Sequence, residues 1–163
     1  LALSPTTPSP YTHTPHPHIH SPTPSASQIT PRLFLADLSA AEDPALLAAL
    51  GITHVLSALP GPVHLPPALR LAALQLPLAD TPFAELAAHL PRTTRWIADA
   101  LDERPDARVL VHCAMGVSRS PSVVAAWLMA ARGWAPEEAI EYVRGRRAGV
   151  CPNEGFVRQL HEY

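Results

Sequence analysis

The sequence contains no lysine, so arginine provides all 12 of its cationic side chains. These are balanced by 14 carboxylates, which gives a formal net charge of −2, and no run of basic residues occurs. A basic patch or stripe is the usual electrostatic footprint of nucleic-acid binding. The composition therefore gives no indication of a nucleic-acid partner.

Long apolar runs are also missing. No stretch approaches the roughly 18 apolar residues that indicate a membrane-spanning helix, so we expect no membrane span. The opening residues Leu1-Ala2-Leu3 provide neither the basic region nor the long apolar core of a secretory signal. Only Cys113 and Cys151 are present, which excludes a disulfide framework. A catalytic thiol needs a reducing compartment, so we expect an intracellular protein, cytoplasmic or nuclear.

Metal and cofactor motifs are scarce too. The nine histidines and two cysteines show no zinc spacing, and no Gly-x-Gly-x-x-Gly dinucleotide fingerprint is found. We therefore expect no metal and no cofactor. His16, His18 and His20, with His13 nearby, could chelate a divalent metal, or they simply reflect the composition of this segment.

The first 31 residues hold no charged side chain and eight of the 20 prolines. Such a segment buries too little apolar surface to offset its ordering entropy. We predict a disordered tail over residues 1–27 and one folded domain over residues 28–163. Residues 1–31 contain seven Ser/Thr-Pro dipeptides, which either serve a proline-directed kinase or follow from proline-rich composition alone. These dipeptides begin at Ser4, Thr7, Ser9, Thr14, Ser21, Thr23 and Thr30.

Strand and helix patterns alternate along the rest of the chain. Gly51 is a good residue to close the first helix, and Pro91, inside a long helix, is expected to kink or break it. This alternation predicts a three-layer α/β domain with a central sheet of about four to five strands. Strands are predicted at 32–36, 52–58, 70–78 and 109–111, and helices near 46–50, 83–103, 117–133, 136–143 and 153–163.

The most informative stretch follows the predicted strand at 109–111. The strand ends in Cys113, Gly116 lets the backbone turn, and a helical pattern begins at Val117. Amides around such a loop and at a helix N-terminus converge on one point, which makes a cradle for phosphate. The same field lowers the pKa of a cysteine, and Arg119 can hold two phosphoryl oxygens at once. The pattern therefore predicts a site for covalent phosphoryl transfer, although Cys113 could instead be a buried structural cysteine.

At these residues the chain resembles a known family, the dual-specificity protein phosphatases, within the cysteine-based protein tyrosine phosphatases. The stretch from His112 to Ser120 is similar to the signature loop of this family. The resemblance extends from about Ile29 to Tyr163 and is to small, stand-alone, atypical members. It also covers Arg144 to Arg147 and the closing pattern Val150-Cys151-Pro152-Asn153 with Gly155-Phe156, in which the asparagine is structural.

The resemblance implies hydrolysis of phosphomonoesters on Tyr, Ser and Thr of proteins through a phosphocysteine on Cys113. Arg119 is implied to clamp the phosphate, and Ser120 to donate to the departing sulfur or to cap the helix. His112 is implied to order the loop, with a satisfied core histidine as the equal alternative. The phosphate-binding backbone is expected at Ala114, Met115, Gly116, Val117, Ser118 and Arg119.

Asp80 is the candidate general acid, because it lies 33 residues before Cys113 on a loop expected at the same edge of the sheet. This matches the position of the acid in the family. Alternatively, Asp80 only hydrogen-bonds the backbone ahead of Thr81-Pro82. Glu85 is the nearest other carboxylate, and Cys151 is a candidate resolving thiol for oxidised Cys113.

Other functions stay open at this point. The phosphate could belong to a lipid, a glycan or a nucleotide rather than to a protein. A rhodanese-like sulfurtransferase also uses a loop cysteine but needs no acid aspartate. A catalytically silent phosphate-binding module normally lacks the nucleophile or the arginine, and this chain has both.

Overall fold

The structure is a computed structural model, and it describes residues 24–163. The predicted disordered tail lies almost entirely outside the described residues, as do the histidine cluster and six of the seven Ser/Thr-Pro dipeptides. The predicted domain boundary after residue 27 falls inside a strand, because β1 already begins at Ala26. Ordered backbone hydrogen bonding thus starts earlier than the composition indicates.

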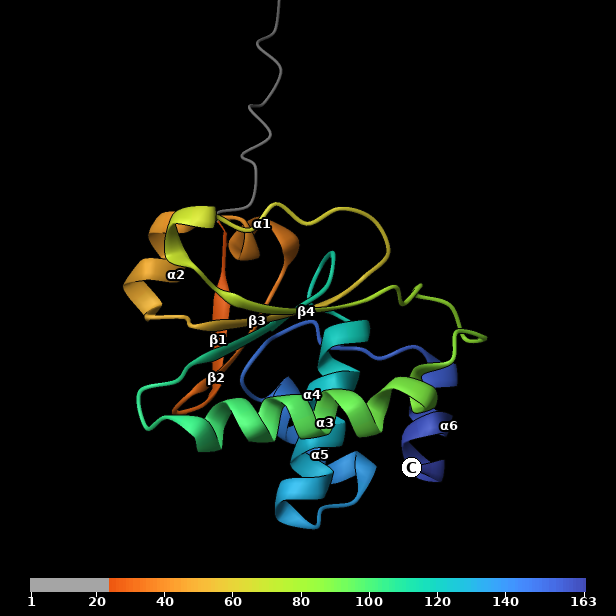
Figure 1. The fold of residues 1–163 in the computed structure, drawn as a ribbon. Coiled ribbons are helices and arrows are strands. Elements are labelled where there is room, and N and C mark those ends of the chain that lie inside the picture. Colours follow the sequence, from red (N-terminus) through yellow and green to blue (C-terminus); the bar gives the residue numbers. More distant parts are fainter. Residues whose placement is uncertain (1–23) are drawn as a thin grey trace, which may run out of the picture.

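A five-stranded mixed sheet forms the centre of the domain, in the order β1-β2-β5-β3-β4 (Figure 1). Strands β2, β5, β3 and β4 are parallel, and β1 pairs antiparallel with β2 at one edge. This arrangement confirms the predicted α/β sheet of four to five strands. The strands are β1 Ala26–Thr30, β2 Leu33–Ala36, β3 His54–Ala58, β4 Ala72–Leu76 and β5 Val109–His112.

Helices cover both faces of the sheet, which gives the three predicted layers (Figure 1). Two short helices and a 3-10 turn lie on one face, and four longer helices lie on the other. The first group is α1 Leu38–Ala41, α2 Pro44–Leu50 and η1 Pro67–Leu69. The second group is α3 Leu86–Glu103, α4 Arg119–Arg132, α5 Pro136–Arg144 and α6 Glu154–Glu162. None of the helices in residues 24–163 has the length and apolar character needed to cross a membrane.

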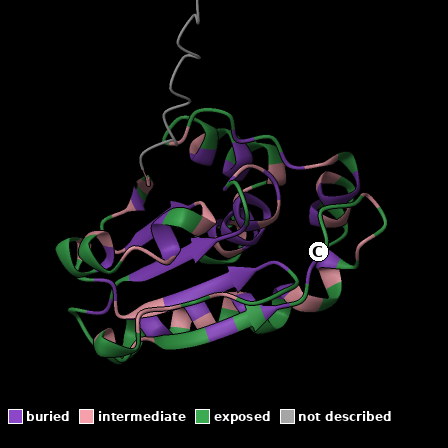
Figure 2. Ribbon diagram, turned by 90° about the horizontal axis from the view of Figure 1, so that it is seen from above, coloured by how far each residue is buried: buried purple, intermediate pink, exposed green. Residues whose placement is uncertain are grey.

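The central strands are buried on both faces because alternate side chains enter two separate cores. In β5, Val109 and Val111 pack toward α3 and α4, whereas Leu110 packs toward α1 and α2. Figure 2 shows these strands buried, with exposed residues concentrated in the connections and on the outer strands. Parallel strands buried in this way read as continuous apolar runs, which is why the sequence predicts β5 well.

Local signals set several helix ends. The side chain of Asp43 accepts hydrogen bonds from the first amides of α2, with Pro44 at the first helical position. Gly51 closes α2 with φ of 65°, as predicted. At the start of α5, Ala135 occupies the capping position and makes no side-chain hydrogen bond to the helix. These helix ends can be predicted from the sequence because the capping residue is next to the helix in the chain.

The predicted break at Pro91 does not occur, since α3 is continuous from Leu86 to Glu103. Pro91 lies in the second turn, where it removes one backbone hydrogen bond. Its ring is exposed, whereas Leu90 and Ile97 are fully buried against the core. Burial of each such side chain contributes about 1.5–3 kcal/mol, which is enough to hold the helix together around the proline.

Candidate active site

The loop between β5 and α4 lies at the C-terminal edge of the sheet, next to its central strand. Cys113 directly follows β5, and α4 begins at Arg119. Gly116, at the turn of the loop, has φ of 68°, and a Cβ atom there would lie 2.6 Å from the carbonyl oxygen of Ala36. Glycine is therefore needed at this position for both its conformation and its size.

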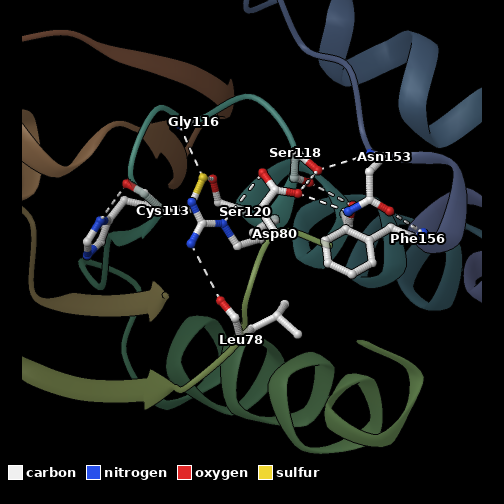
Figure 3. A network of polar contacts seen from close by, with 11 residues as sticks. Leu78, Asp80, Cys113, Gly116, Ser118, Ser120, Asn153 and Phe156 are labelled. Carbon is white, nitrogen blue, oxygen red and sulfur yellow. Dashed lines mark hydrogen bonds and ion pairs between the residues drawn. The ribbon is translucent and has the colours of Figure 1, made fainter. Parts of the chain in front are cut away.

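Cys113 is 1 % exposed, and two donors point at its sulfur (Figure 3). The Gly116 amide lies 3.2 Å from Sγ, and the Ser120 hydroxyl lies 3.1 Å from it. Burial alone raises the pKa of the Cys113 thiol, but these hydrogen bonds, the Ser120 backbone amide and the charge of Arg119 together lower the pKa below its ordinary value. The site therefore stabilises a thiolate, the nucleophilic form of the residue.

The Arg119 guanidinium lies between the loop and the segment that follows β4. Its Nη1 is 3.5 Å from the carbonyl oxygen of Leu78, and its Nε is 3.7 Å from Oδ2 of Asp80. Nε is buried and donates no hydrogen bond within residues 24–163. A buried charged donor without an acceptor is costly. An oxyanion held in the loop would supply the acceptor that this nitrogen lacks.

Asp80 lies at the same site, although it is 33 residues away in sequence. Its Oδ1 accepts hydrogen bonds from the Ser118 hydroxyl at 2.7 Å and from Nδ2 of Asn153 at 2.9 Å (Figure 3). Within the described residues, the carboxylate accepts no backbone hydrogen bond, which argues against the alternative that it only starts the next helix. The Ser118 side chain binds Asp80, while its backbone amide stays the predicted part of the phosphate cradle.

Asn153 connects the acid loop to α6. Its Oδ1 accepts from the Phe156 amide and caps the helix, while Nδ2 donates to Asp80 and the backbone amide donates to the Ser118 hydroxyl at 3.0 Å. One side chain thus fixes a helix end and the candidate acid together. The sequence predicts a structural asparagine here, but its contact with Asp80 has no local signal.

His112 is buried beneath the loop, and burial lowers the pKa of its ring. The neutral ring has one donor and one acceptor nitrogen. Its Nδ1 lies 3.2 Å from the Cys113 carbonyl oxygen, so it donates there, and Nε2 accepts from the Ser57 hydroxyl at 2.6 Å. The geometry assigns the tautomer and places His112 behind the nucleophile, as a support for its backbone.

Arg147 supports the first half of the loop, a role that the sequence does not reveal. Its Nε and Nη2 donate to the carbonyl oxygens of Gly116 and Met115 at 3.2 and 3.3 Å. The same side chain reaches Asp37 at 3.9 Å and the Ser27 hydroxyl at 3.3 Å. It therefore ties the loop to β1 and to the turn before α1.

Two predicted candidates lie outside this network. Cys151 is an exposed free thiol, and only its backbone amide reaches the loop, at Val117. Glu85 is exposed at the start of α3, with no hydrogen bond to the site among the described residues. Neither position supports a part in the chemistry.

A buried cysteine with two hydrogen-bond donors on its sulfur, beside an arginine and a carboxylate at the sheet edge, is typical of a cysteine-dependent phosphatase. Residues 33–163 match the family described as "Dual specificity phosphatase, catalytic domain", and the chain belongs to that family. It is 41% identical over 140 residues to dual specificity protein phosphatase 13B of Mus musculus, covering 82% of this chain and 70% of that protein.

Solved structures agree. A mouse putative dual specificity phosphatase complexed with zinc tungstate has a TM-score of 0.80 and 32% identity, covering 88% of each chain. Human DUSP28 has a TM-score of 0.79 and 32% identity, covering 86% of this chain and 93% of that one. The chain is thus a small atypical dual-specificity protein phosphatase, as the loop predicts, and not a sulfurtransferase.

Replacing Gly155 with alanine is expected to displace the acid loop. A Cβ atom there would lie 1.9 Å from the carbonyl oxygen of Pro82, so the backbone after Asp80 must move by about 1 Å. A misplacement of this size costs about 100-fold in rate. Steady-state hydrolysis of an alkyl phosphate and of an activated aryl phosphate measures the effect, and the alkyl ester should lose more.

The matched control is Gly145→Ala, because an added Cβ there meets its neighbours at 3.5 Å without strain. It should leave both rates unchanged. If Gly155→Ala slows both esters equally, the glycine does not act through Asp80.

Proposed function

We propose that Cys113 is the nucleophile, Arg119 the phosphate clamp and Asp80 the general acid and base of protein phosphomonoester hydrolysis. The observation that carries this assignment is the Cys113 sulfur, which is almost fully buried and yet has the Gly116 amide and the Ser120 hydroxyl within 3.2 Å. A structural cysteine in a core has no such donors around it. Burial together with donated hydrogen bonds is the environment of an activated nucleophile.

In the first step, the thiolate of Cys113 attacks phosphorus and the bond to the ester oxygen breaks. The leaving oxygen takes the proton of Asp80, and the product is a phosphocysteine together with the dephosphorylated residue. The loop amides and the Arg119 fork hold the oxygens on which negative charge increases. The buried Nε of Arg119 then gains an acceptor.

In the second step, Asp80 takes a proton from water, which attacks phosphorus and breaks the bond to sulfur. The electron pair returns to Cys113 as a thiolate. The Ser120 hydroxyl and the Gly116 amide, both within 3.2 Å of Sγ, stabilise this leaving group. The same two donors therefore serve both steps.

The orientation of Asp80 supports its role. Ser118 and Asn153 both donate to Oδ1, and Oδ2 lies on the side of Arg119. The carboxylate is fixed at one oxygen, and its other oxygen is turned toward the phosphate clamp. Its side chain is 36% exposed, which leaves it open to a substrate and to water.

The setting of the enzyme is part of the proposal. A thiolate nucleophile requires reducing conditions, which supports an intracellular location, in the cytoplasm or the nucleus. The Ser/Thr-Pro dipeptides before residue 31 support a proline-directed kinase that acts on the N-terminal segment. The second candidate is a substrate whose phosphate is on a lipid, a glycan or a nucleotide. Comparing the hydrolysis rates of such compounds with those of phosphopeptides distinguishes the two substrate classes.

Replacing Asp80 with asparagine is expected to slow esters with poor leaving groups by about 10²–10⁴-fold. Esters with acidic leaving groups need little protonation, so their loss should be smaller. The rate rises with pH as Cys113 ionises, and the lowered pKa of this thiol places the rise below the ordinary thiol range. The rate falls as the acid loses its proton, so the fall should flatten in the variant while the rise remains.

The measurement is kcat/KM against pH for a series of aryl and alkyl phosphates. Glu85→Gln is the matched control, and it should leave every rate unchanged. An equal loss for all leaving groups, with an unaltered pH profile, would show that Asp80 only shapes its loop.

A further inference from the structure

A groove of about 570 Å³ lies beside the first half of the phosphate loop. Its walls come from the turn before α1, from α1 itself and from two loop residues. The Leu38 amide donates to the Ala114 carbonyl at 3.1 Å, so the groove continues directly from the cradle. The residues that line it are Asp37, Leu38, Ser39, Glu42, Ala114 and Met115.

The groove lies across the loop from Asp80. The acid is bound to Ser118 in the second half of the loop, whereas Ala114 and Met115 belong to the first half. A phosphorylated side chain that enters between the two halves therefore has the acid on one side. The residues that flank the phosphorylated side chain then contact the groove on the opposite side of the loop.

Two carboxylates line this groove. Oε1 of Glu42 accepts from the His64 amide at 2.7 Å and lies 3.3 Å from the His64 ring, whereas Oε2 accepts no hydrogen bond within residues 24–163. Oδ1 of Asp37 caps α1 through Ala40. Its Oδ2 lies 3.9 Å from the Arg147 guanidinium. Asp37 is thus held at both oxygens, whereas Oε2 of Glu42 is the carboxylate oxygen that is available to a ligand.

The charge balance of the groove is negative. Arg147 donates to the loop carbonyls of Met115 and Gly116 and balances Asp37, so Glu42 carries the uncompensated charge of the groove. Two apolar side chains also line the groove, Leu38, which is partly buried, and Met115, which is 71% exposed. The groove therefore combines an apolar surface with a negative edge.

We propose that this groove binds a basic side chain, arginine or lysine, that flanks the phosphorylated residue of the substrate. This inference rests on the proposed function, because it places the phosphate of the same peptide at Cys113. The aliphatic stem would cover Leu38 and Met115, and the cationic head would reach Glu42, with Asp37 behind it. Charge complementarity and continuity with the cradle favour this ligand over an acidic residue or a second phosphate.

The test uses phosphopeptides in which one flanking position at a time carries arginine or citrulline. Citrulline keeps the stem and removes the charge. We expect kcat/KM for arginine to exceed that for citrulline by about three- to tenfold at one or two flanking positions, as for a partly exposed ion pair. Glu42→Gln keeps the oxygen that accepts from the His64 amide, so the fold should persist, and it should bring the ratio close to one.

Glu138→Gln is the matched control, since it removes the same charge from the exposed start of α5, on the other face of the sheet (Figure 1). It should leave the arginine preference intact. Hydrolysis of a small aryl phosphate should be equal in all three proteins, because such a substrate does not reach the groove. Binding of the same peptides to Cys113→Ser protein gives the preference without turnover.

A ratio near one at every flanking position in the unaltered protein would overturn the proposal. So would an arginine preference that survives Glu42→Gln. If the unaltered protein does not hydrolyse an aryl phosphate, the proposed function is contradicted. Peptide binding to the Cys113→Ser protein would still show whether the groove prefers a basic side chain.

Discussion

Replacing Cys113 with serine is expected to abolish turnover, with a loss of roughly 10⁴–10⁶-fold. The serine hydroxyl fits the loop and can still accept from the Gly116 amide and from Ser120. It is not ionised near neutral pH, so no nucleophile is present. Single-turnover and steady-state rates on an aryl phosphate measure the loss.

The fold and the phosphate cradle should survive this substitution. Tungstate or inorganic phosphate should therefore still raise the melting temperature of the Cys113→Ser protein. Cys151→Ser is the matched control and should hydrolyse the substrate at the normal rate, because that thiol is exposed and outside the site. Retention of more than a few per cent of activity would remove Cys113 from the nucleophile role.

The second large effect is expected for Arg119→Lys, even though the charge is conserved. Lysine has no planar fork, so it cannot bind two phosphoryl oxygens at once or replace the buried Nε. Each lost donor to a developing oxyanion costs about 10²–10³-fold in kcat. We expect kcat to fall far more than KM rises, because the lost interaction is made mainly in the transition state.

Arg92→Lys provides the control, because Arg92 is exposed on α3. It should behave like the unaltered protein. A normal rate for Arg119→Lys would mean that the loop amides alone hold the phosphate, and the clamp would have to be abandoned.

The parts of the fold that the sequence predicts are those with local causes. The strand, glycine and helix around Cys113 occupy one continuous stretch, so their spacing can be read directly. The end of α2 at Gly51 is readable for the same reason. The position of Asp80 can be predicted only indirectly. It follows from the rule that the carboxyl ends of parallel strands share one edge of the sheet, together with the family resemblance.

The missed features depend on contacts between distant residues. In β1 only Ile29 is fully buried, so the strand has no alternating pattern and exists because β2 is beside it. Arg147 lies in a stretch that resembles the family, but nothing in the sequence indicates that it binds loop carbonyls 31 and 32 residues away. At Pro91 the predicted break does not occur, because tertiary burial of α3 outweighs the local preference of proline.

The central position of β5 sets how firmly the two parts of the site are held. Its backbone is hydrogen-bonded to β2 on one side and to β3 on the other, so its amides should exchange with deuterium only when the whole sheet opens. Asp80 lies instead on the loop after β4, where side-chain hydrogen bonds from Ser118 and Asn153 hold it. We therefore expect the backbone beneath Cys113 to exchange on the timescale of global unfolding, and the loop that carries Asp80 to exchange well before it.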